Sequence, residues 1–398
     1  MTARQITTLA DVCESVRYGY TASASLEPCG PRFLRITDIV PDSLDWESVP
    51  YCPIEEDDRQ RFALQVNDIV VARTGATVGY AKLIRETEDS VFASYLVRFR
   101  VDPSKAYPPF VGRLVESQVY KAFVQSRIGG AAQPNASAPV LGSFEFALPD
   151  RDAQERIADT LSAYDDLIEN NRRRMAMLEE SARLLYQEWF VRLRFPGHEH
   201  VRVKNGIPDG WTRESLREIA KVNRANMGRS FDGKIDYIDI ASVTPGQINE
   251  TTHYDFKEAP SRARRIVQHG DIIWSCVRPN RKSHAVIWRP SPYLIASTGF
   301  AVITPIRVPT SYLLHATTTT DFVGYLENHA KGAAYPAVVA DDFERALILV
   351  PSKAILDVFN DFAEPLFEQC YFLRQQNLKL RTARDLLLPR LMSVEVIV

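Results

Sequence analysis

The sequence lacks long apolar segments. None of its apolar runs approaches the roughly 20 residues that a membrane-spanning helix needs, and its first residues lack the apolar core of a signal peptide. Its five cysteines are scattered and form no Cys-x-x-Cys pair, which argues against a disulfide framework or a zinc site. The formal net charge of -2 does not mark the whole chain as a nucleic-acid binder. We therefore expect a soluble protein of the reducing cytoplasm, with no membrane partner.

Motifs for catalysis are also scarce. The chain has no G-x-G-x-x-G and no G-x-x-x-x-G-K-[ST], so no cradle for a dinucleotide or a nucleoside triphosphate is indicated. One spacing is nuclease-like, because Pro208-Asp209 precedes Asp232-Gly233-Lys234 and could mimic a two-carboxylate-plus-lysine metal site. Both stretches are also typical of turns, which we favour. The sequence therefore predicts no catalytic residue and no metal ligand in this chain.

What the sequence does contain is an internal repeat. The stretch "NDIVVARTGATVGYAKLI" (67–84) matches "GDIIWSCVRPNRKSHAVI" (270–287), and "GGAAQPN" (129–135) matches "KGAAYPA" (331–337). Further pairs occur at nearly the same separation. Each copy is rich in β-branched and aromatic runs punctuated by Gly and Pro, which predicts short strands. Repetition at one separation indicates two similar globular regions.

A long helix is predicted after each copy, the first from Ala153 to Phe190, with Asp150 or Asp152 as its cap. Apolar residues in this helix follow a 4-3 spacing, which predicts a coiled-coil seam. The same register carried into the second helix is poorer, because Asn377 and Arg384 are polar and Pro365 is expected to interrupt the helix. Alternatively, each helix packs only on its own globular region. The seam comprises Ile157, Leu161, Tyr164, Ile168, Asn171, Met175, Leu178 and Leu185 in the first helix, and Phe359, Leu366, Leu373, Leu380 and Leu387 in the second.

The order of these segments predicts an α+β fold. Two similar mixed α/β domains are each followed by a long helix, and the helices would pack as an antiparallel coiled coil with pseudo-two-fold symmetry. Asn171 would suit a polar layer that fixes the register. The expected boundaries are globular domain one at 1–150, helical region one at 151–195, a linker at 196–212, globular domain two at 213–350 and helical region two at 351–398.

Several stretches resemble the DNA-specificity subunits of Type I restriction–modification systems. They are "LPDRDAQERIADTLSAYDDLIENN" (148–171) with "ARLLYQEWF" (182–190), "GIPDGWTRESLREIAKV" (206–222), "LKLRTARDLLLPRLMS" (378–393) and the strand motif "NDIVVARTGATVGY" (67–80). The resemblance covers essentially the whole chain. It departs from the family at the helix openings, where a Pro-Pro-x-x-Glu-Gln pattern is usual and "LPDRDAQER" and "VPSKAILDV" stand here.

The resemblance implies a non-catalytic subunit that reads double-stranded DNA. Each recognition domain would read one half of a bipartite target, and the helices would set the spacer between the halves. The helices would also dock two methyltransferase subunits, and the assembly would recruit motor-nuclease subunits for defence against foreign DNA. S-adenosylmethionine, ATP and Mg are expected only in those partners, so this chain would bind no cofactor. The alternative is a metal-dependent nuclease or a methyltransferase fragment with duplicated DNA-binding domains.

Reading DNA requires Arg, Lys, Asn, Gln, Ser or Thr side chains on loops, because these groups form hydrogen bonds with base edges. The segment "RPNRKSH" (278–284) is the best single candidate, since it is basic and occupies the repeat position of "RTGATVG" (73–79). Arg172–Arg174 fit either a solvated helix face or a contact with DNA or a partner. The candidate DNA-binding residues are Arg32, Arg35, Arg73, Thr74, Thr77, Gln133, Asn135, Arg278, Asn280, Arg281, Lys282, Lys331 and Tyr335.

Overall fold

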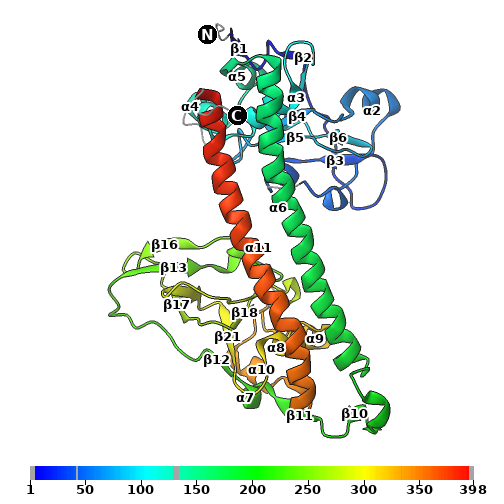
Figure 1. Cartoon of the computed structure of the whole chain (residues 1–398), viewed down its shortest axis with the longest axis vertical. Helices are drawn as coiled ribbons and strands as arrows, with labels where there is room; N and C mark the ends of the chain where they lie inside the picture. Colours follow the sequence, from blue (N-terminus) through cyan, green and yellow to red (C-terminus); the bar gives the residue numbers. More distant parts are fainter. Residues whose placement is uncertain (1–4, 42–43, 129–133, 333, 394–398) are drawn as a thin grey trace. The chain divides into compact units, whose positions relative to one another are not determined.

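The computed structural model describes residues 5–41, 44–128, 134–332 and 334–393. The chain divides into two compact units, of which unit 1 comprises Met1–Arg172 and Gln375–Val398, and unit 2 comprises Arg173–Arg374. The two longest helices, α6 (Arg151–Tyr186) and α11 (Lys353–Ser393), are green and orange-to-red in Figure 1, and each contributes residues to both units. Within the part of the chain that the structure describes, no helix is long and apolar enough to cross a membrane.

Unit 1 is built around a sheet with strand order β2-β7-β4-β5, in which all neighbours are antiparallel. Its central strand β4 reads Ile-Val-Val-Ala and is buried along its whole length, as expected for β-branched residues covered on both faces. A parallel pair, β3-β6, and an antiparallel pair, β1-β8, complete the strands. Their bounds are β1 (Gln5–Thr8), β2 (Cys13–Tyr18), β3 (Arg32–Leu34), β4 (Ile69–Ala72), β5 (Ala81–Leu83), β6 (Ser90–Phe92), β7 (Leu96–Val101) and β8 (Glu145–Leu148).

Unit 2 repeats this plan with strand order β12-β21-β18-β19, again antiparallel throughout. A parallel pair, β13-β20, and an antiparallel pair, β11-β22, recur, and β16 and β17 extend the β13-β20 pair into a larger sheet. Bounds are β11 (Thr212–Ser215), β12 (Ala220–Val222), β13 (Lys234–Ile238), β14 (Val243–Thr244), β15 (Gln247–Ile248), β16 (Thr252–Asp255), β17 (Ala263–Ile266), β18 (Ile272–Ser275), β19 (His284–Val286), β20 (Leu294–Ser297), β21 (Phe300–Pro305) and β22 (Leu347–Val350).

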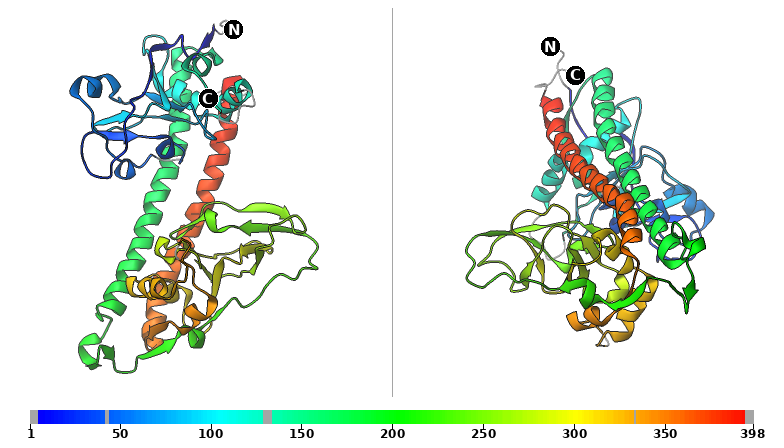
Figure 2. Two further views of the ribbon diagram at one scale, coloured as in Figure 1. Left: turned by 180° about the vertical axis from the view of Figure 1, so that it is seen from behind. Right: turned by 60° about the horizontal axis from the view of Figure 1, so that its bottom comes forward.

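The shorter helices follow the same duplication. In both units two helices follow the long strand of the main sheet, and the second of them is capped by a hydroxyl, Ser117 in unit 1 and Thr319 in unit 2. The remaining short helices lie in the connections of each unit (Figure 2). Bounds are α1 (Ile36–Ile39), α2 (Glu56–Phe62), α3 (Pro108–Val115), α4 (Gln118–Arg127), α5 (Ala138–Gly142), α7 (Leu216–Ile219), α8 (Thr310–Ala316), α9 (Thr320–His329) and α10 (Ala340–Arg345).

This correspondence confirms the α+β class and the two similar regions, each followed by a long helix. The expected linker is more structured than predicted. It holds a 3-10 turn (His198–His200) and the hairpin β9 (Val203–Lys204)–β10 (Ile207–Pro208). Buried Phe195 and Trp211 stack at its two ends with ring centroids 4.7 Å apart, so apolar packing orders the segment.

Helix α6 begins after Asp150, whose carboxylate accepts the N–H of Ala153 at 2.9 Å. The segment Arg151–Tyr186 contains no Gly or Pro, so the α-helix continues without interruption for 36 residues. The regular helix ends earlier than predicted, because Gln187–Val191 form a wider π turn.

In unit 1 the α6 and α11 segments run antiparallel. Asp165 contacts Arg384, and further along α6 Asn171 contacts Asn377, so rising numbers in one helix meet falling numbers in the other. Leu391 belongs to the same buried cluster as Ile157 and Leu161. Of the predicted seam residues in this unit, Ile157, Leu161, Ile168 and Asn171 are buried, and Tyr164, Leu380 and Leu387 are partly exposed.

In unit 2 the remaining segments also run antiparallel. The Cys370 Sγ lies 3.9 Å from the Met175 carbonyl oxygen, whereas Trp189 meets Phe359 edge to face with ring centroids 6.0 Å apart. Burying an apolar side chain such as that of Phe359 stabilises the folded protein by about 1.5–3 kcal/mol relative to leaving the side chain exposed. Of the predicted seam residues in this unit, Phe359 and Leu373 are buried, and Met175, Leu178, Leu185 and Leu366 are partly exposed.

The expected interruption at Pro365 is wrong, because α11 continues through it from Lys353 to Ser393. Proline removes the donor that would reach the carbonyl of residue 361. Pro365 and Asp361 are both exposed, so water can satisfy that carbonyl. Buried Phe359 and Ala363 hold the same turns from the other side.

A pair of buried amides crosses the helix seam of unit 1. The Asn171 Nδ2 donates to Asn377 Oδ1 at 2.9 Å, and Asn377 Nδ2 donates to the Ile168 carbonyl at 3.2 Å. Both side chains are about 95% buried, with 4% and 5% exposure. A single register satisfies both amides, so this pair acts against slipped arrangements of the helices.

We expect Asn171→Leu alone, or Asn377→Leu alone, to lower the free energy of unfolding by about 1–3 kcal/mol, because each removes the hydrogen bond that joins the two buried amides. The double leucine variant is expected to recover that loss. Urea unfolding followed by circular dichroism, arranged as a double-mutant cycle, measures the coupling. Additive single effects would show that the amides are independent.

Candidate nucleic-acid interface

Two loops of unit 1 are joined into one surface, which we call loop pair 1 (residues 73–80 and 134–136). The first loop connects antiparallel β4 and β5, as expected of a hairpin turn. The Gly75 N–H donates to the Pro134 carbonyl at 3.0 Å, and the Ala136 N–H donates to the Arg73 carbonyl at 2.8 Å. The Arg73 Nη2 also donates to Asn135 Oδ1 at 3.2 Å. The sheet therefore presents Arg73, Thr74 and Asn135 together.

Unit 2 has the equivalent surface, loop pair 2 (residues 276–283 with 331, 332 and 334–337). The Arg278 N–H donates to the Pro336 carbonyl at 2.7 Å, and the Val338 N–H donates to the Cys276 carbonyl at 2.9 Å. The first loop connects β18 and β19, the counterparts of β4 and β5. Each half of the repeat thus builds the same two-loop platform on the same sheet edge.

Loop pair 2 is the more basic surface. Its first loop contains a 3-10 turn (Pro279–Arg281) flanked by Arg278 and Lys282, both in the left-handed region with φ of 51° and 52°. Such conformations cost on the order of 1–3 kcal/mol in residues other than glycine and concentrate where ligands bind. Candidates in this pair that lie exposed are Asn280, Arg281, Lys282, Lys331 and Tyr335.

One arginine of each loop pair lies against a tyrosine ring. The Arg73 guanidinium lies 4.7 Å from the Tyr18 ring centroid, and the Arg278 guanidinium lies 4.7 Å from that of Tyr335. Tyr18 is absent from the sequence candidates. Its hydroxyl accepts the N–H of Ala138 at 2.8 Å, a contact across 120 residues that no local pattern reveals.

Two candidates lie on another element and have partners within the protein. Arg32 in β3 donates to the Val49 carbonyl at 2.7 Å, and its guanidinium lies 4.3 Å from the Tyr51 ring centroid. Arg35 forms a 2.9 Å ion pair with Asp38. These contacts give both arginines a role in the fold of unit 1.

The other predicted positions are placed as follows. Thr77 lies in the loop that joins β4 and β5, and its carbonyl accepts the N–H of Tyr80 at 3.0 Å. Gln133 lies outside the described residues. Arg172 is 3.7 Å from Glu169, an ion pair on the face of α6.

The residues of the nuclease-like stretches lie in a turn, an ion pair and a strand of unit 2. Asp209 follows β10, and its N–H donates to the Arg202 carbonyl at 2.8 Å. The Lys257 Nζ lies 3.1 Å from Asp232 Oδ2, and Lys234 begins β13. Among the residues that the structure describes, no group of three or more His, Cys, Asp or Glu could hold a metal ion.

Comparison with known proteins defines the class. Residues 5–180 match the family model of the Type I restriction modification DNA specificity domain. The MjaIX type I restriction enzyme specificity subunit of Methanocaldococcus jannaschii is 25% identical over 299 residues, 71% of this chain and 68% of that protein. The HindI specificity subunit of Haemophilus influenzae is 23% identical over 350 residues, 70% of this chain and 74% of that protein.

The fold agrees with a solved structure. The Type-I restriction-modification system S subunit from M. genitalium has a TM-score of 0.55 and 17% identity, covering 98% of this chain and 97% of that one. Residues 5–180 therefore carry the Type I restriction modification DNA specificity domain, and the whole chain shares the fold of that S subunit. The chain as a whole is similar to the specificity (S) subunits of the type I systems, as the sequence resemblance predicted.

Proposed function

We propose that this subunit reads a bipartite DNA target, with loop pair 1 reading one half and loop pair 2 the other. The duplication of the two-loop platform carries this proposal. Each platform presents arginine and amide or lysine side chains from a rigid sheet edge, which suits hydrogen bonding to base edges. Arginines that reach only phosphate would position the protein without specifying sequence.

The helices are proposed to set the number of unread base pairs between the half-sites. Supporting this role, α6 and α11 each contribute to both units, and the Asn171–Asn377 pair favours one register in unit 1. A fixed register is what a device of defined length requires.

We further propose that the helical regions dock two methyltransferase subunits, through which motor-nuclease subunits join the assembly. S-adenosylmethionine, ATP and Mg would be bound by those partners, and this chain would act as a non-catalytic subunit. Exposed apolar side chains on the helices, including Leu167, Met177, Phe372 and Leu386, support a protein-binding role.

Exchange of one recognition region tests the assignment of half-sites. Replacing residues 213–350 with the same region of a relative is expected to change one half of the methylated target and leave the other half unchanged, because each loop pair belongs to its own unit. The reciprocal exchange of residues 1–150 is the matched control and should change the opposite half. Mapping modified adenines in cells carrying each hybrid measures both outcomes. A hybrid in which both halves change together would contradict independent reading.

A further inference from the structure

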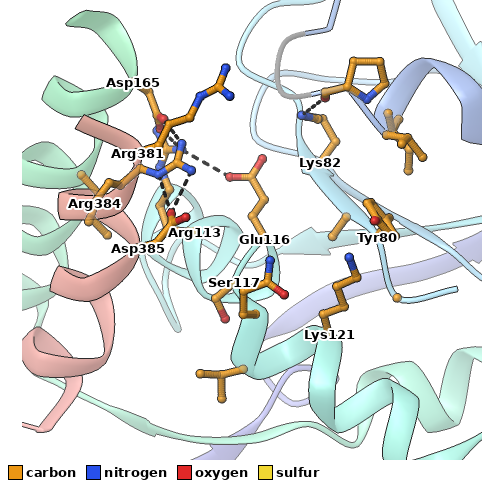
Figure 3. Close-up of a pocket in the computed structure, with 18 of the residues that line it drawn as sticks. Tyr80, Lys82, Arg113, Glu116, Ser117, Lys121, Asp165, Arg381, Arg384 and Asp385 are labelled. Atoms are coloured by element: carbon orange, nitrogen blue, oxygen red, sulfur yellow. Dashed lines mark hydrogen bonds and ion pairs between the residues drawn. The ribbon is translucent and has the colours of Figure 1, made fainter. Parts of the chain in front are cut away.

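Unit 1 contains a cavity of about 310 Å³ beside loop pair 1 (Figure 3). Its wall includes Gly79 and Tyr80 of that loop pair, the first turn of α4, and residues of α6 and α11 that belong to unit 1. Figure 3 shows Asp165, Arg113 and Arg384 on one side, Lys82, Tyr80 and Lys121 on the other, and Glu116 between them. The cavity therefore adjoins a surface that we propose contacts DNA.

The side chains that line this cavity are mainly cationic. Asp165 is paired with Arg85 at 2.7 Å, with Arg384 at 2.5 Å and with Arg113. Glu116 lies 3.3 Å from Arg113, and it also accepts the N–H of Leu83 at 2.9 Å. Three lining acids, Glu116, Asp165 and Asp385, face six lining cations: Lys82, Arg85, Arg113, Lys121, Arg381 and Arg384. Lys121 contributes positive charge on the opposite wall, where its Nζ lies 3.5 Å from the Tyr80 ring centroid.

Backbone donors add to this charge. Helix α4 is ten residues long, and its N-terminal residues Ser117, Gln118 and Val119 line the cavity. The first N–H groups of a helix have no intrahelical partner and carry partial positive charge, which makes a helix N-terminus a phosphate site. The Ser117 hydroxyl accepts the N–H of Tyr120, so the first two residues of α4, Gln118 and Val119, are the ones whose N–H groups a ligand would meet.

Arg113 supplies a second, independent sign of a ligand. Its side chain is only 7% exposed, and among the residues that the structure describes its Nε has no hydrogen-bond partner. A buried donor without a partner costs stability unless a bound group satisfies it. Burial lowers the pKa of Arg113, against the opposing effect of Glu116 and Asp165, so an added anion would favour the charged form.

The other half of the repeat shows that the fold does not require charges here. The positions equivalent to Arg85, Arg113 and Asp165 are Trp288, His315 and Phe367 of unit 2, from the matched pairings of β5 with β19, α3 with α8 and the two long helices. In unit 2 the Phe367 ring lies 5.8 Å from Trp288 and 6.3 Å from His315, centroid to centroid. In unit 2, three packed rings therefore occupy the positions that hold an ion-pair cluster in unit 1.

We propose that the unit 1 cavity binds a phosphate group, and that in the DNA complex this group is a backbone phosphate next to the half-site read by loop pair 1. This inference rests on the proposed function for the source of the phosphate, because Gly79 and Tyr80 belong to both the loop pair and the cavity wall. The Lys121 Nζ, 3.5 Å from the Tyr80 ring centroid, is the cation that links the two. The site would fix the position of the backbone without reading bases.

Lys121→Gln tests the site. Arg127→Gln is its matched control, because this substitution also removes one positive charge from α4, but at the end of the helix away from the cavity. With the full chain assembled with its methyltransferase subunits, Lys121→Gln is expected to reduce the slope of log affinity against log salt by about 0.9 and to weaken binding about five- to eight-fold near 0.1–0.15 M salt. Specific and nonspecific duplexes should weaken alike. Arg127→Gln should leave the slope unchanged.

Two further arms identify the source of the phosphate. A duplex with one neutral methylphosphonate linkage, moved along the backbone, should lose affinity at one position for the wild type and not for Lys121→Gln. Inorganic phosphate, compared with chloride at equal ionic strength, should raise the melting temperature of the wild type more than that of Lys121→Gln. If only the melting temperature responds to inorganic phosphate and no methylphosphonate position matters, the cavity binds a free phosphate ion and not a backbone phosphate of DNA.

Equal salt slopes for wild type and Lys121→Gln, together with no difference in either arm, would overturn the site. Failure of the proposed function has a different signature. In that case the wild-type assembly would prefer no duplex sequence, while the melting response to inorganic phosphate would still decide whether the cavity binds phosphate.

Discussion

Asp165→Asn is expected to lower the free energy of unfolding by about 3–5 kcal/mol, because it leaves buried arginines without their carboxylate. Asp165 has a side chain 10% exposed, and the paired Arg113 and Arg384 are 7% and 27% exposed. Arg85 is 43% exposed, so water screens its share of the loss. The neutral amide keeps the shape of the carboxylate, which isolates the effect of charge.

The same residue predicts a pH dependence. Burial alone would raise the pKa of Asp165, but Arg113, Arg85 and Arg384 outweigh burial and hold the pKa below its ordinary value. A lowered folded-state pKa contributes stability above the unfolded value of about 3.9, and this contribution is lost as the pH falls through the folded value. The wild type should therefore lose stability on acidification below about pH 4, and Asp165→Asn should lose less.

Asp166→Asn is the matched control, since Asp166 is the next residue of α6 and is exposed. It should change the free energy of unfolding by no more than about 0.5 kcal/mol. Urea unfolding at pH 7 and at a series of lower pH values measures both variants. Similar stabilities for the two asparagine variants at pH 7 would mean that the arginines find other counter-charges.

Lengthening both helices by one heptad is expected to abolish methylation of the native target and to create activity on a target with a longer spacer. Seven residues add about 10.5 Å of helix, close to three base-pair steps of about 3.4 Å. The insertion points are the boundaries between the units, after Arg172 in α6 and after Arg374 in α11. A whole heptad keeps the apolar register of both helices. This prediction rests on the proposed function.

A library of targets with every spacer length, methylated by the assembled complex, measures the change. Insertion into α6 alone is the control, because helices of unequal length cannot keep both sets of seam contacts. It should yield little activity at any spacer. An active double-insertion complex that still prefers the native spacer would refute the role of the helices as a spacer device.

Much of the fold follows from local sequence. The β-branched runs around residues 69–72 and 272–275 predict central strands, and they occupy equivalent places in matching sheets. The 4-3 spacing predicts which face of each long helix is covered, because helix geometry alone fixes that face. Loop residues such as Arg73 and Arg278 follow from the positions of the hairpins.

Contacts across the chain could not be predicted in this way. Arg384 looks like a defect in an apolar seam, yet its partner Asp165 is 219 residues away. Arg32 has the residue type expected for DNA contacts, but the surrounding fold supplies the Val49 carbonyl and the Tyr51 ring as its partners. Pairing of each hairpin with its second loop depends on the sheet that brings them together. The type of each side chain can be read from the sequence, whereas its partner is known only when the whole chain has folded.

The division of α6 and α11 between the units has a consequence for synthesis. Unit 1 is discontinuous in sequence, since it requires both Met1–Arg172 and Gln375–Val398. On the ribosome, residues 1–172 emerge before Arg384 and Asn377, the α11 partners of Asp165 and Asn171, are translated. Unit 1 can therefore complete these two contacts only after synthesis has passed residue 384.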